Sequence, residues 1–126
     1  MIIPITPQPK PRMTRADSWK RRPAVLRYWR YKDELKKYDI QLGKVLSVTF
    51  VLPIPKSWSN KKREDYLGQA HQNRPDLDNL VKALQDSLLD EDSHIYGYEG
   101  VYKIWGLEGA ILIDEPRPEA ISDRHP

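Results

Sequence analysis

The sequence predicts an α/β (α+β) protein in which a small mixed sheet of about four strands packs with two to three helices. Apolar residues recur at helical spacing in 23–38 and again in 77–88. They alternate at period two in 44–52, and two further strand-like segments follow at 98–105 and 107–113. The 126 residues suit one compact core. We therefore expect one domain over 1–114 and a flexible polar tail over 115–126.

The N-terminal third is expected to form a short edge strand, a loop and a helix. Residues 2–5 have the composition of an edge strand, and prolines 7, 9 and 11 forbid regular pairing after it. Pro23 suits a first helical turn. The apolar stripe that follows predicts about four helical turns and consists of Ala24, Tyr28, Tyr31, Leu35 and Tyr38.

The segment 44–52 is expected to be a central strand because both of its faces carry strand-forming residues. Its predicted inner face consists of Leu46, Val48, Phe50 and Leu52. After Pro53 and Pro55, either Ser57 or Ser59 can cap a short helix that Gly68 closes.

The segment 77–88 gives the clearest helical pattern. Its apolar stripe consists of Leu77, Leu80, Val81, Leu84 and Leu88. The two strands that follow are expected to join near Gly106 and Gly109.

Charge is divided unevenly along the chain. Residues 1–74 carry 17 basic and 6 acidic side chains, whereas residues 75–126 carry 4 basic and 12 acidic ones. A basic half suits a phosphate backbone and an acidic region suits cations, although folding could interleave the two into a mixed surface. The expected DNA-binding residues are Lys10, Arg12, Arg15, Lys20, Arg21, Arg22, Lys61, Lys62 and Arg63.

Several classes of protein are disfavoured. The chain has no cysteine, so it predicts neither disulfides nor a thiolate zinc site. It shows no signal peptide or membrane span, and a cytoplasmic protein with no membrane partner is expected. The absence of a Gly-rich phosphate loop argues against a nucleotide cofactor. The three histidines are too isolated to form a metal site.

The candidate catalytic residues cluster at the start of the helix at 77–88. Asp78, Asn79, Lys82 and Asp86 lie opposite its leucine stripe, and Asp76 comes just before it, where it can cap the helix. A second acidic group follows at 90–92. Carboxylates from two elements suffice for Mg²⁺, and Lys82 can reach the same phosphate. Asp86 is expected to orient Lys82. Alternatively, the first-turn acids only complement the helix dipole.

The tryptophans are divided between core and surface. Core packing is expected for Trp29 and Trp105. Trp58, which precedes the basic run at 61–63, is the best candidate for stacking on a base, and Trp19 is the next.

The motifs Arg-Pro-Asp-Leu-Asp-Asn-Leu-Val-Lys at 74–82, Asp-Ser-Leu at 86–88 and Glu-Asp-Ser-His-Ile at 91–95 resemble the RusA family of Holliday junction resolvases. Segments 10–14 and 55–63 resemble its phage-type members. The resemblance implies a homodimer from a bacterial cell, a phage or a prophage, which makes paired nicks in four-way junction DNA with Mg²⁺ or Mn²⁺.

Carried over by residue, the resemblance assigns catalysis and metal binding to Asp76, Asp78 and Asp92, and assigns the functional lysine to Lys82. Glu91 departs from the usual pair of aspartates, and the connection from 86 to 92 is shorter than in typical members. Asp90 or Glu91 could therefore take the place of Asp92, and Glu91 is otherwise given a supporting role with Asn79 and Asp86.

Two other functions stay open at this stage. One is a DNA-binding module without catalysis, and the other is a metal-dependent nuclease acting on forks or flaps. A dimer has a geometric rationale because two symmetric cuts require two symmetric sites. The tyrosine stripe at 28, 31 and 38 or an exposed sheet edge could form its interface.

Overall fold

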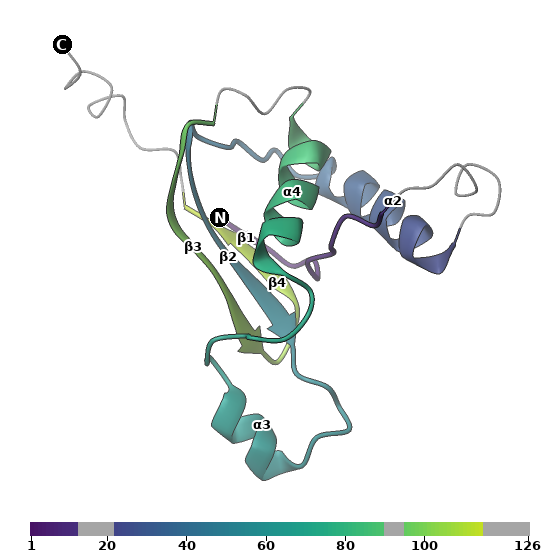
Figure 1. Ribbon diagram of the computed structural model, residues 1–126, viewed down its shortest axis with the longest axis vertical. Helices are drawn as coiled ribbons and strands as arrows, with labels where there is room; N and C mark the ends of the chain where they lie inside the picture. The colour runs from purple at the N-terminus through teal and green to yellow at the C-terminus, as the bar shows by residue number, and fades with distance from the viewer. Residues whose placement is uncertain (13–21, 90–94, 115–126) are drawn as a thin grey trace.

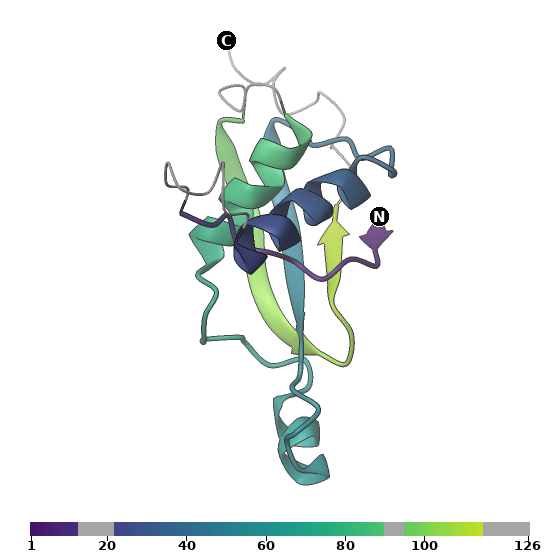
Figure 2. The same cartoon turned by 90° about the vertical axis from the view of Figure 1, so that its right-hand side faces the viewer.

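The computed structural model describes residues 1–12, 22–89 and 95–114. Its elements, in chain order, are β1 (Ile2–Ile3), α2 (Pro23–Leu35), β2 (Val45–Pro53), α3 (Asn60–Tyr66), α4 (Leu77–Leu88), β3 (Gly97–Gly106) and β4 (Ala110–Ile113). The helices α2 and α4 cover one face of the sheet, and α3 lies beyond one end of it (Figure 1 and Figure 2). The expected fold class is confirmed.

The four strands form one mixed sheet in the order β1-β4-β2-β3. The central strand β2 pairs in parallel with β3 and antiparallel with β4, and β4 pairs antiparallel with β1. The consecutive strands β3 and β4 therefore lie on opposite sides of β2 and do not form a hairpin. Their connection passes the end of β2, where the Ile54 N–H donates to the Gly106 carbonyl at 2.8 Å.

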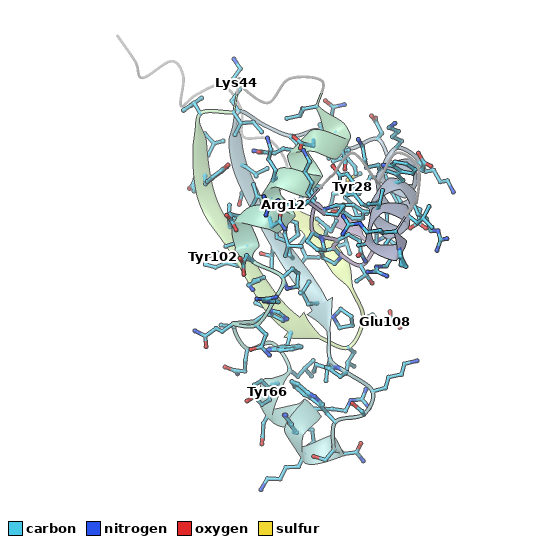
Figure 3. All side chains as sticks on the ribbon, turned by 45° about the vertical axis from the view of Figure 1, so that its right-hand side comes forward. Arg12, Tyr28, Lys44, Tyr66, Tyr102 and Glu108 are labelled. Carbon is cyan, nitrogen blue, oxygen red and sulfur yellow. The ribbon has the colours of Figure 1, made fainter. Side chains whose placement is uncertain are left out.

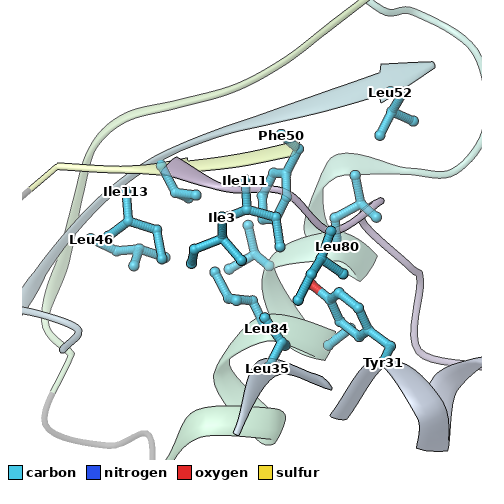
Figure 4. Packing of buried hydrophobic residues seen from close by; sticks show 14 of the residues in the cluster. Ile3, Tyr31, Leu35, Leu46, Phe50, Leu52, Leu80, Leu84, Ile111 and Ile113 are labelled. Atoms are coloured by element: carbon cyan, nitrogen blue, oxygen red, sulfur yellow. The ribbon is translucent and has the colours of Figure 1, made fainter. Parts of the chain in front are cut away.

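The core lies between the sheet and the two helices (Figure 4). On β2, Leu46, Val48, Phe50 and Leu52 are buried, as their period-two spacing predicts. Helix α4 adds Leu80 and Leu84. These side chains belong to one cluster that also includes residues of β1, α2 and β4. Burial of this apolar surface is the main favourable term in folding.

Helix α2 is shorter than expected. It ends at Leu35, and the buried face is formed by Val25, Tyr28, Tyr31 and Leu35. Ala24 is only half-buried, and Tyr38 is exposed at 36%. After the helix, the backbone N–H groups of Lys37 and Tyr38 donate to the carbonyls three residues earlier, those of Glu34 and Leu35.

The expectation that Trp29 is a core residue is wrong, because its side chain is 39% exposed. It directly follows Tyr28, and successive helical residues point about 100° apart. Trp105 is buried, as expected, at 6% exposure. The prediction for Trp19 lies outside the described residues.

Helix α3 is a short outlying element with no fully buried residue. Ser59, one of the two expected caps, accepts a hydrogen bond from the Lys62 N–H at 3.2 Å. Gly68 follows the helix with φ +79°, a conformation that glycine adopts without strain. In the part of the chain that the structure describes, the helices are too short and too polar to cross a membrane.

Candidate active site

Asp76 and Asp78 stand at the N-terminal end of α4. Asp76 occupies the N-cap position in an extended conformation, and its carbonyl accepts the first helical bond from Leu80 N at 3.2 Å. Its side chain makes no capping hydrogen bond, contrary to our expectation. Asp78 uses Oδ1 to accept the Asn79 N–H at 2.9 Å. Both aspartates are exposed because the apolar stripe of α4 faces the core.

Lys103 of β3 holds the loop that leads to Asp76. It pairs in register with Phe50 on the central strand, and its ammonium donates to the carbonyls of Asn73 at 2.5 Å and Pro75 at 2.6 Å. Bonds from a charged donor are stronger than neutral ones. This lysine therefore fixes the backbone immediately before the candidate metal ligand.

Asp86 lies between two lysines. Its Oδ2 accepts from the Lys10 ammonium at 2.5 Å, and its Oδ1 lies 3.4 Å from the Lys82 ammonium. Burial raises the pKa of Asp86, but the hydrogen bond and charge of Lys10, with smaller effects from Lys82, outweigh it and lower the pKa. Asp86 is therefore ionised at neutral pH and joins the N-terminal loop to α4.

This arrangement gives Lys10 a role that the sequence did not reveal. Lys10 was expected to bind DNA, yet its ammonium is committed to a carboxylate beside the site. The expected pairing of Asp86 with Lys82 is present, although at a longer distance than the contact with Lys10. Lys10, Lys82 and Asp86 together carry one net positive charge on this side of α4.

A groove of about 440 Å³ runs between α4 and β3. Asp78 and Lys82 are two of its lining residues and lie one helical turn apart. The groove brings a carboxylate and an ammonium to one surface. A phosphodiester bound there would meet a candidate metal ligand and a cation together.

The described residues include only part of the expected metal site. They contain no group of three acidic or histidine side chains that could hold an ion. Asp92, the expected third ligand, and its alternatives Asp90 and Glu91 lie outside the described residues. The meeting of the two acidic segments therefore stays a prediction.

The basic residues fall into two regions. Arg22 donates to the Arg12 carbonyl at 2.7 Å at the base of α2. On α3, Lys61 and Lys62 are exposed and Arg63 is half-buried. Figure 3 shows Arg12 beside the two long helices and Tyr66 on the outlying helix. The expected contacts of Arg15, Lys20 and Arg21 lie outside the described residues.

Trp58 is part of an aromatic cluster under α3. Its ring lies 5.0 Å from that of Trp105 and 5.1 Å from that of Tyr66. The Lys62 ammonium stands 4.0 Å from the centre of the Trp58 ring. Cation–π attraction therefore holds one of the expected DNA-binding lysines on the surface of this cluster. Stacking of Trp58 on a base stays a prediction.

Two residues at the site were missed in the sequence. Gln85 is a buried polar residue of α4, and Lys103 is a cation on the inner face of β3. Each interrupts an apolar pattern: Gln85 lies four residues after Val81, and Lys103 lies between Val101 and Trp105 at period two. Polar residues in such stripes are the signal that could have identified them.

The family comparison matches residues 3–114 of the chain to the model described as Endodeoxyribonuclease RusA. The comparison with curated proteins found no match, and neither did the comparison with solved structures.

Proposed function

Because the chain belongs to the RusA endodeoxyribonuclease family, we propose that it resolves Holliday junctions by paired, metal-dependent phosphodiester hydrolysis in recombination and repair. The observation that carries this proposal is the groove in which Asp78 and Lys82 lie together. Family membership implies cleavage of DNA within a strand. The metal, the paired cuts and the biological setting are the finer parts of the proposal.

The residues at the start of α4 are suited to a divalent cation. Asp76 and Asp78 are exposed, and within the described residues neither forms an ion pair. Mg²⁺ and Mn²⁺ prefer oxygen ligands, and one or two carboxylates with phosphate and water complete a magnesium site. Asp76 and Asp78 would hold the ion, with Asp92 as third ligand. When bound, such an ion polarises the scissile phosphate and lowers the pKa of a bound water.

The other residues position the phosphate. Lys82 lines the groove and would donate to a phosphoryl oxygen, where its charge stabilises the negative charge that develops during hydrolysis. Asp86 holds Lys82 on this side of α4, and Lys10 balances the charge of Asp86. Lys103 fixes the loop before Asp76. Asn79 contributes its backbone N–H to Asp78.

The basic surface of α3 would grip the DNA backbone away from the cut. Lys61 and Lys62 are exposed on a helix that extends beyond the sheet (Figure 1). Phosphate contacts of this kind supply affinity and orientation without reading sequence. DNA binding and catalysis are therefore assigned to different residues.

A homodimer is part of the proposal because a four-way junction has approximate two-fold symmetry. Tyr28 and Tyr31 are buried in the core of the protomer at 3% exposure each, so they are unavailable as an interface. The exposed Tyr38 and the sheet edge are the expected surfaces that remain. Light scattering after size exclusion should give the mass of two chains, and a monomeric mass in the active protein would remove the dimer from the account.

The function is tested with a labelled four-way junction and matched fork, flap and linear duplexes. In Mg²⁺ the wild type should cut the junction, and a chelator should stop it. Asp76→Asn and Asp78→Asn should each slow cutting by at least about a hundredfold while junction binding persists. Asp33→Asn, an exposed aspartate on α2, serves as the matched control.

Undiminished cutting by both site variants would defeat the mechanism. Metal-independent binding without any nicks would favour a DNA-binding module instead. Equal rates on forks, flaps and linear duplex would remove selectivity for junctions but keep the nuclease.

A further inference from the structure

The outer surface of α2 carries a group of cations that has no role in the proposed function so far. Residues 22–37 contain six basic and two acidic side chains, a balance of +4. The apolar face of the helix is buried in the core, so most of these charges face outward. The exposed basic side chains are Arg22, Arg27, Arg30, Lys36 and Lys37.

Four of these cations are unpaired within the part of the chain that the structure describes. There, no ion pair is formed by the side chains of Arg27, Arg30, Lys36 and Lys37. Arg27 and Arg30 are three residues apart and are therefore neighbours on the helix surface, where like charges repel each other. A bound polyanion would remove this repulsion.

Two large apolar side chains lie on the same helix between these charges. Leu26 and Trp29 are each 39% exposed. Surfaces that bind nucleic acid often combine cations with exposed aromatic rings. The outer surface of α2 therefore has the composition of a contact surface and differs from a helix face that carries only solvated charges.

The α2 surface is continuous with the candidate active site. Burial raises the pKa of Tyr28 of α2, and the charges of Lys10 and Asp86 also act on it, so these two groups lie close to the helix. The Lys32 ammonium lies 5.4 Å from the centre of the Tyr28 ring. Cations therefore follow one another from Lys82 in the groove, through Lys10, to α2.

The helices α2 and α3 lie in different directions from the groove. The groove runs between α4 and β3, whereas α3 lies beyond one end of the sheet and α2 lies beside α4 on the side away from β3 (Figure 1 and Figure 2). Duplex DNA has a persistence length of about 50 nm, so a sharp bend within one small domain requires energy. A straight duplex in contact with α3 and the groove would therefore leave α2 unoccupied, but a branched DNA has a further arm that can reach it.

We propose that the outer surface of α2 binds the phosphate backbone of a second arm of a branched DNA, and that this contact makes the nuclease favour junctions over linear duplex. The inference rests on the proposed function. DNA fits better than an acidic protein as the occupant, because the cations lead away from the groove and the family cleaves DNA.

Arg27 and Arg30 would contact phosphates of this arm, and the release of counterions would supply affinity. Phosphate contacts also fix the orientation of the nucleic acid. With one arm on α3 and another on α2, the crossover would lie near the groove that contains Asp78 and Lys82. A linear duplex would lack the second contact.

The test measures the affinity for a four-way junction and for a linear duplex with the sequence of one arm. Binding is followed in the presence of a chelator, so that no cutting occurs, between about 50 and 200 mM salt. The α2 variant is Arg27→Met/Arg30→Met. Its matched comparison is the α3 variant Lys61→Met/Lys62→Met, which removes the same number of charges. Lys44→Met is the control for the loss of an exposed cation elsewhere.

In the α2 variant, junction affinity should fall about tenfold, and the slope of log affinity against log salt should fall by about two, because two phosphate contacts are lost. Affinity for linear duplex should change by less than about twofold, whereas the α3 variant should weaken the binding of both DNAs. The single variant Arg30→Met should show about half of the change in slope. Both arginines are exposed and methionine has a similar helix propensity, so Tm should stay close to that of the wild type.

The outcomes separate this inference from the proposed function. Equal losses of affinity for junction and duplex in the α2 variant would show that α2 holds the arm that is cut, and unchanged junction affinity would show that α2 does not bind DNA. Either result overturns the inference, while a wild type that cuts junctions keeps the proposed function. If the wild type neither cuts nor prefers a junction, the proposed function fails and the inference fails with it.

Discussion

The ion pair between Lys10 and Asp86 should link the stability of the fold to the rate of cleavage. We would replace Lys10→Met and Asp86→Asn singly and together. The two residues are 76 positions apart, and the bond joins the N-terminal loop to the helix that carries Asp78 and Lys82. The pair is therefore a tertiary contact whose loss loosens the site.

The expected coupling free energy between Lys10 and Asp86 follows from the geometry of the contact and from the exposure of the two side chains. A hydrogen bond to a charged group contributes about 1.5–3 kcal/mol, whereas an exposed ion pair contributes about 0.2–1 kcal/mol. The side chains of Lys10 and Asp86 are 36% and 22% exposed, so screening by water moves the value towards the lower range. We expect a coupling free energy of about 1 kcal/mol, which corresponds to roughly 4 °C in Tm for a domain of this size.

The contact between Asp86 and Lys82 should contribute less. Its distance is 3.4 Å, and the Lys82 side chain is 53% exposed. Pairs of this type within a helix contribute about 0.3–0.5 kcal/mol, and the basic residue here precedes the acidic one, which is the less favourable order. Lys10 is thus the main partner of Asp86. Its loss should leave Asp86 to draw Lys82 away from the phosphate.

Two assays measure these effects. Chemical denaturation of the wild type, the two single variants and the double variant gives the coupling free energy. Cleavage measured at a saturating concentration of junction gives kcat. Lys10→Met should lower kcat several-fold with little change in KM, and it should have little further effect when Asp86 is already Asn. Lys44→Met is the control because Lys44 is exposed at the far end of the sheet (Figure 3).

The pH dependence has a defined sign. The folded pKa of Asp86 is lowered, so its contribution is present above the unfolded value of about 3.9 and is lost as pH falls through the folded pKa. The coupling should therefore be constant between about pH 5 and 8. A zero coupling free energy would show that the pair does not stabilise the fold. A loss of junction affinity with unchanged kcat would show that Lys10 contacts DNA instead.

Three further predictions concern the surroundings of the site. Burial, and after it the charge of Lys103, lowers the pKa of His71. The wild type should therefore lose stability as pH falls below about 6.5, the unfolded pKa of histidine. His71→Phe should remove this slope when Tm is measured against pH. Lys103→Met should lower the free energy of unfolding by about 1–2 kcal/mol and reduce kcat, because two backbone carbonyls before Asp76 lose their donor. An unchanged kcat would show that this loop does not position Asp76. The double variant Lys61→Met/Lys62→Met should weaken junction binding and reduce the slope of log affinity against log salt by about two, and an unchanged slope would exclude α3 from the DNA contact.

Local patterns predicted the elements that bury one face. The alternation from Val45 to Leu52 predicts β2 because it has a period of two, and the stripe from Leu77 to Leu88 predicts α4 because it has helical spacing. The end of α2 was less predictable. Tyr38 continues the spacing of its stripe, but the chain turns after Leu35, and this turn depends on the path to β2.

Contacts between distant residues could not be obtained from the sequence. Nothing in the local pattern places β2 between β3 and β4, because strand order depends on packing across the whole sheet. In the same way, the sequence shows Lys10 only as one of several basic residues in a loop, and the fold brings it to Asp86. The candidate site residues could be predicted from the sequence more readily, because Asp76, Asp78 and Lys82 occupy one short segment with a specific motif.

Gln85 shows a different limit. Its position within the apolar stripe of α4 was visible, but the groove beside it requires β3 to pack at a defined distance. A single polar residue in a stripe is compatible with several structural roles. Its place in the wall of this groove follows from the packing of α4 on β3 and not from the stripe.

The central claim is that Asp76 and Asp78 share one cation with Asp92 from the following acidic segment. Electron paramagnetic resonance of bound Mn²⁺ tests this directly by counting ions in the wild type, Asp78→Asn and Asp92→Asn. The account predicts one tightly bound ion per chain that is lost in both variants. Undiminished Mn²⁺ binding by Asp92→Asn, and likewise by Asp90→Asn and Glu91→Gln, would show that the two acidic segments do not form a common site.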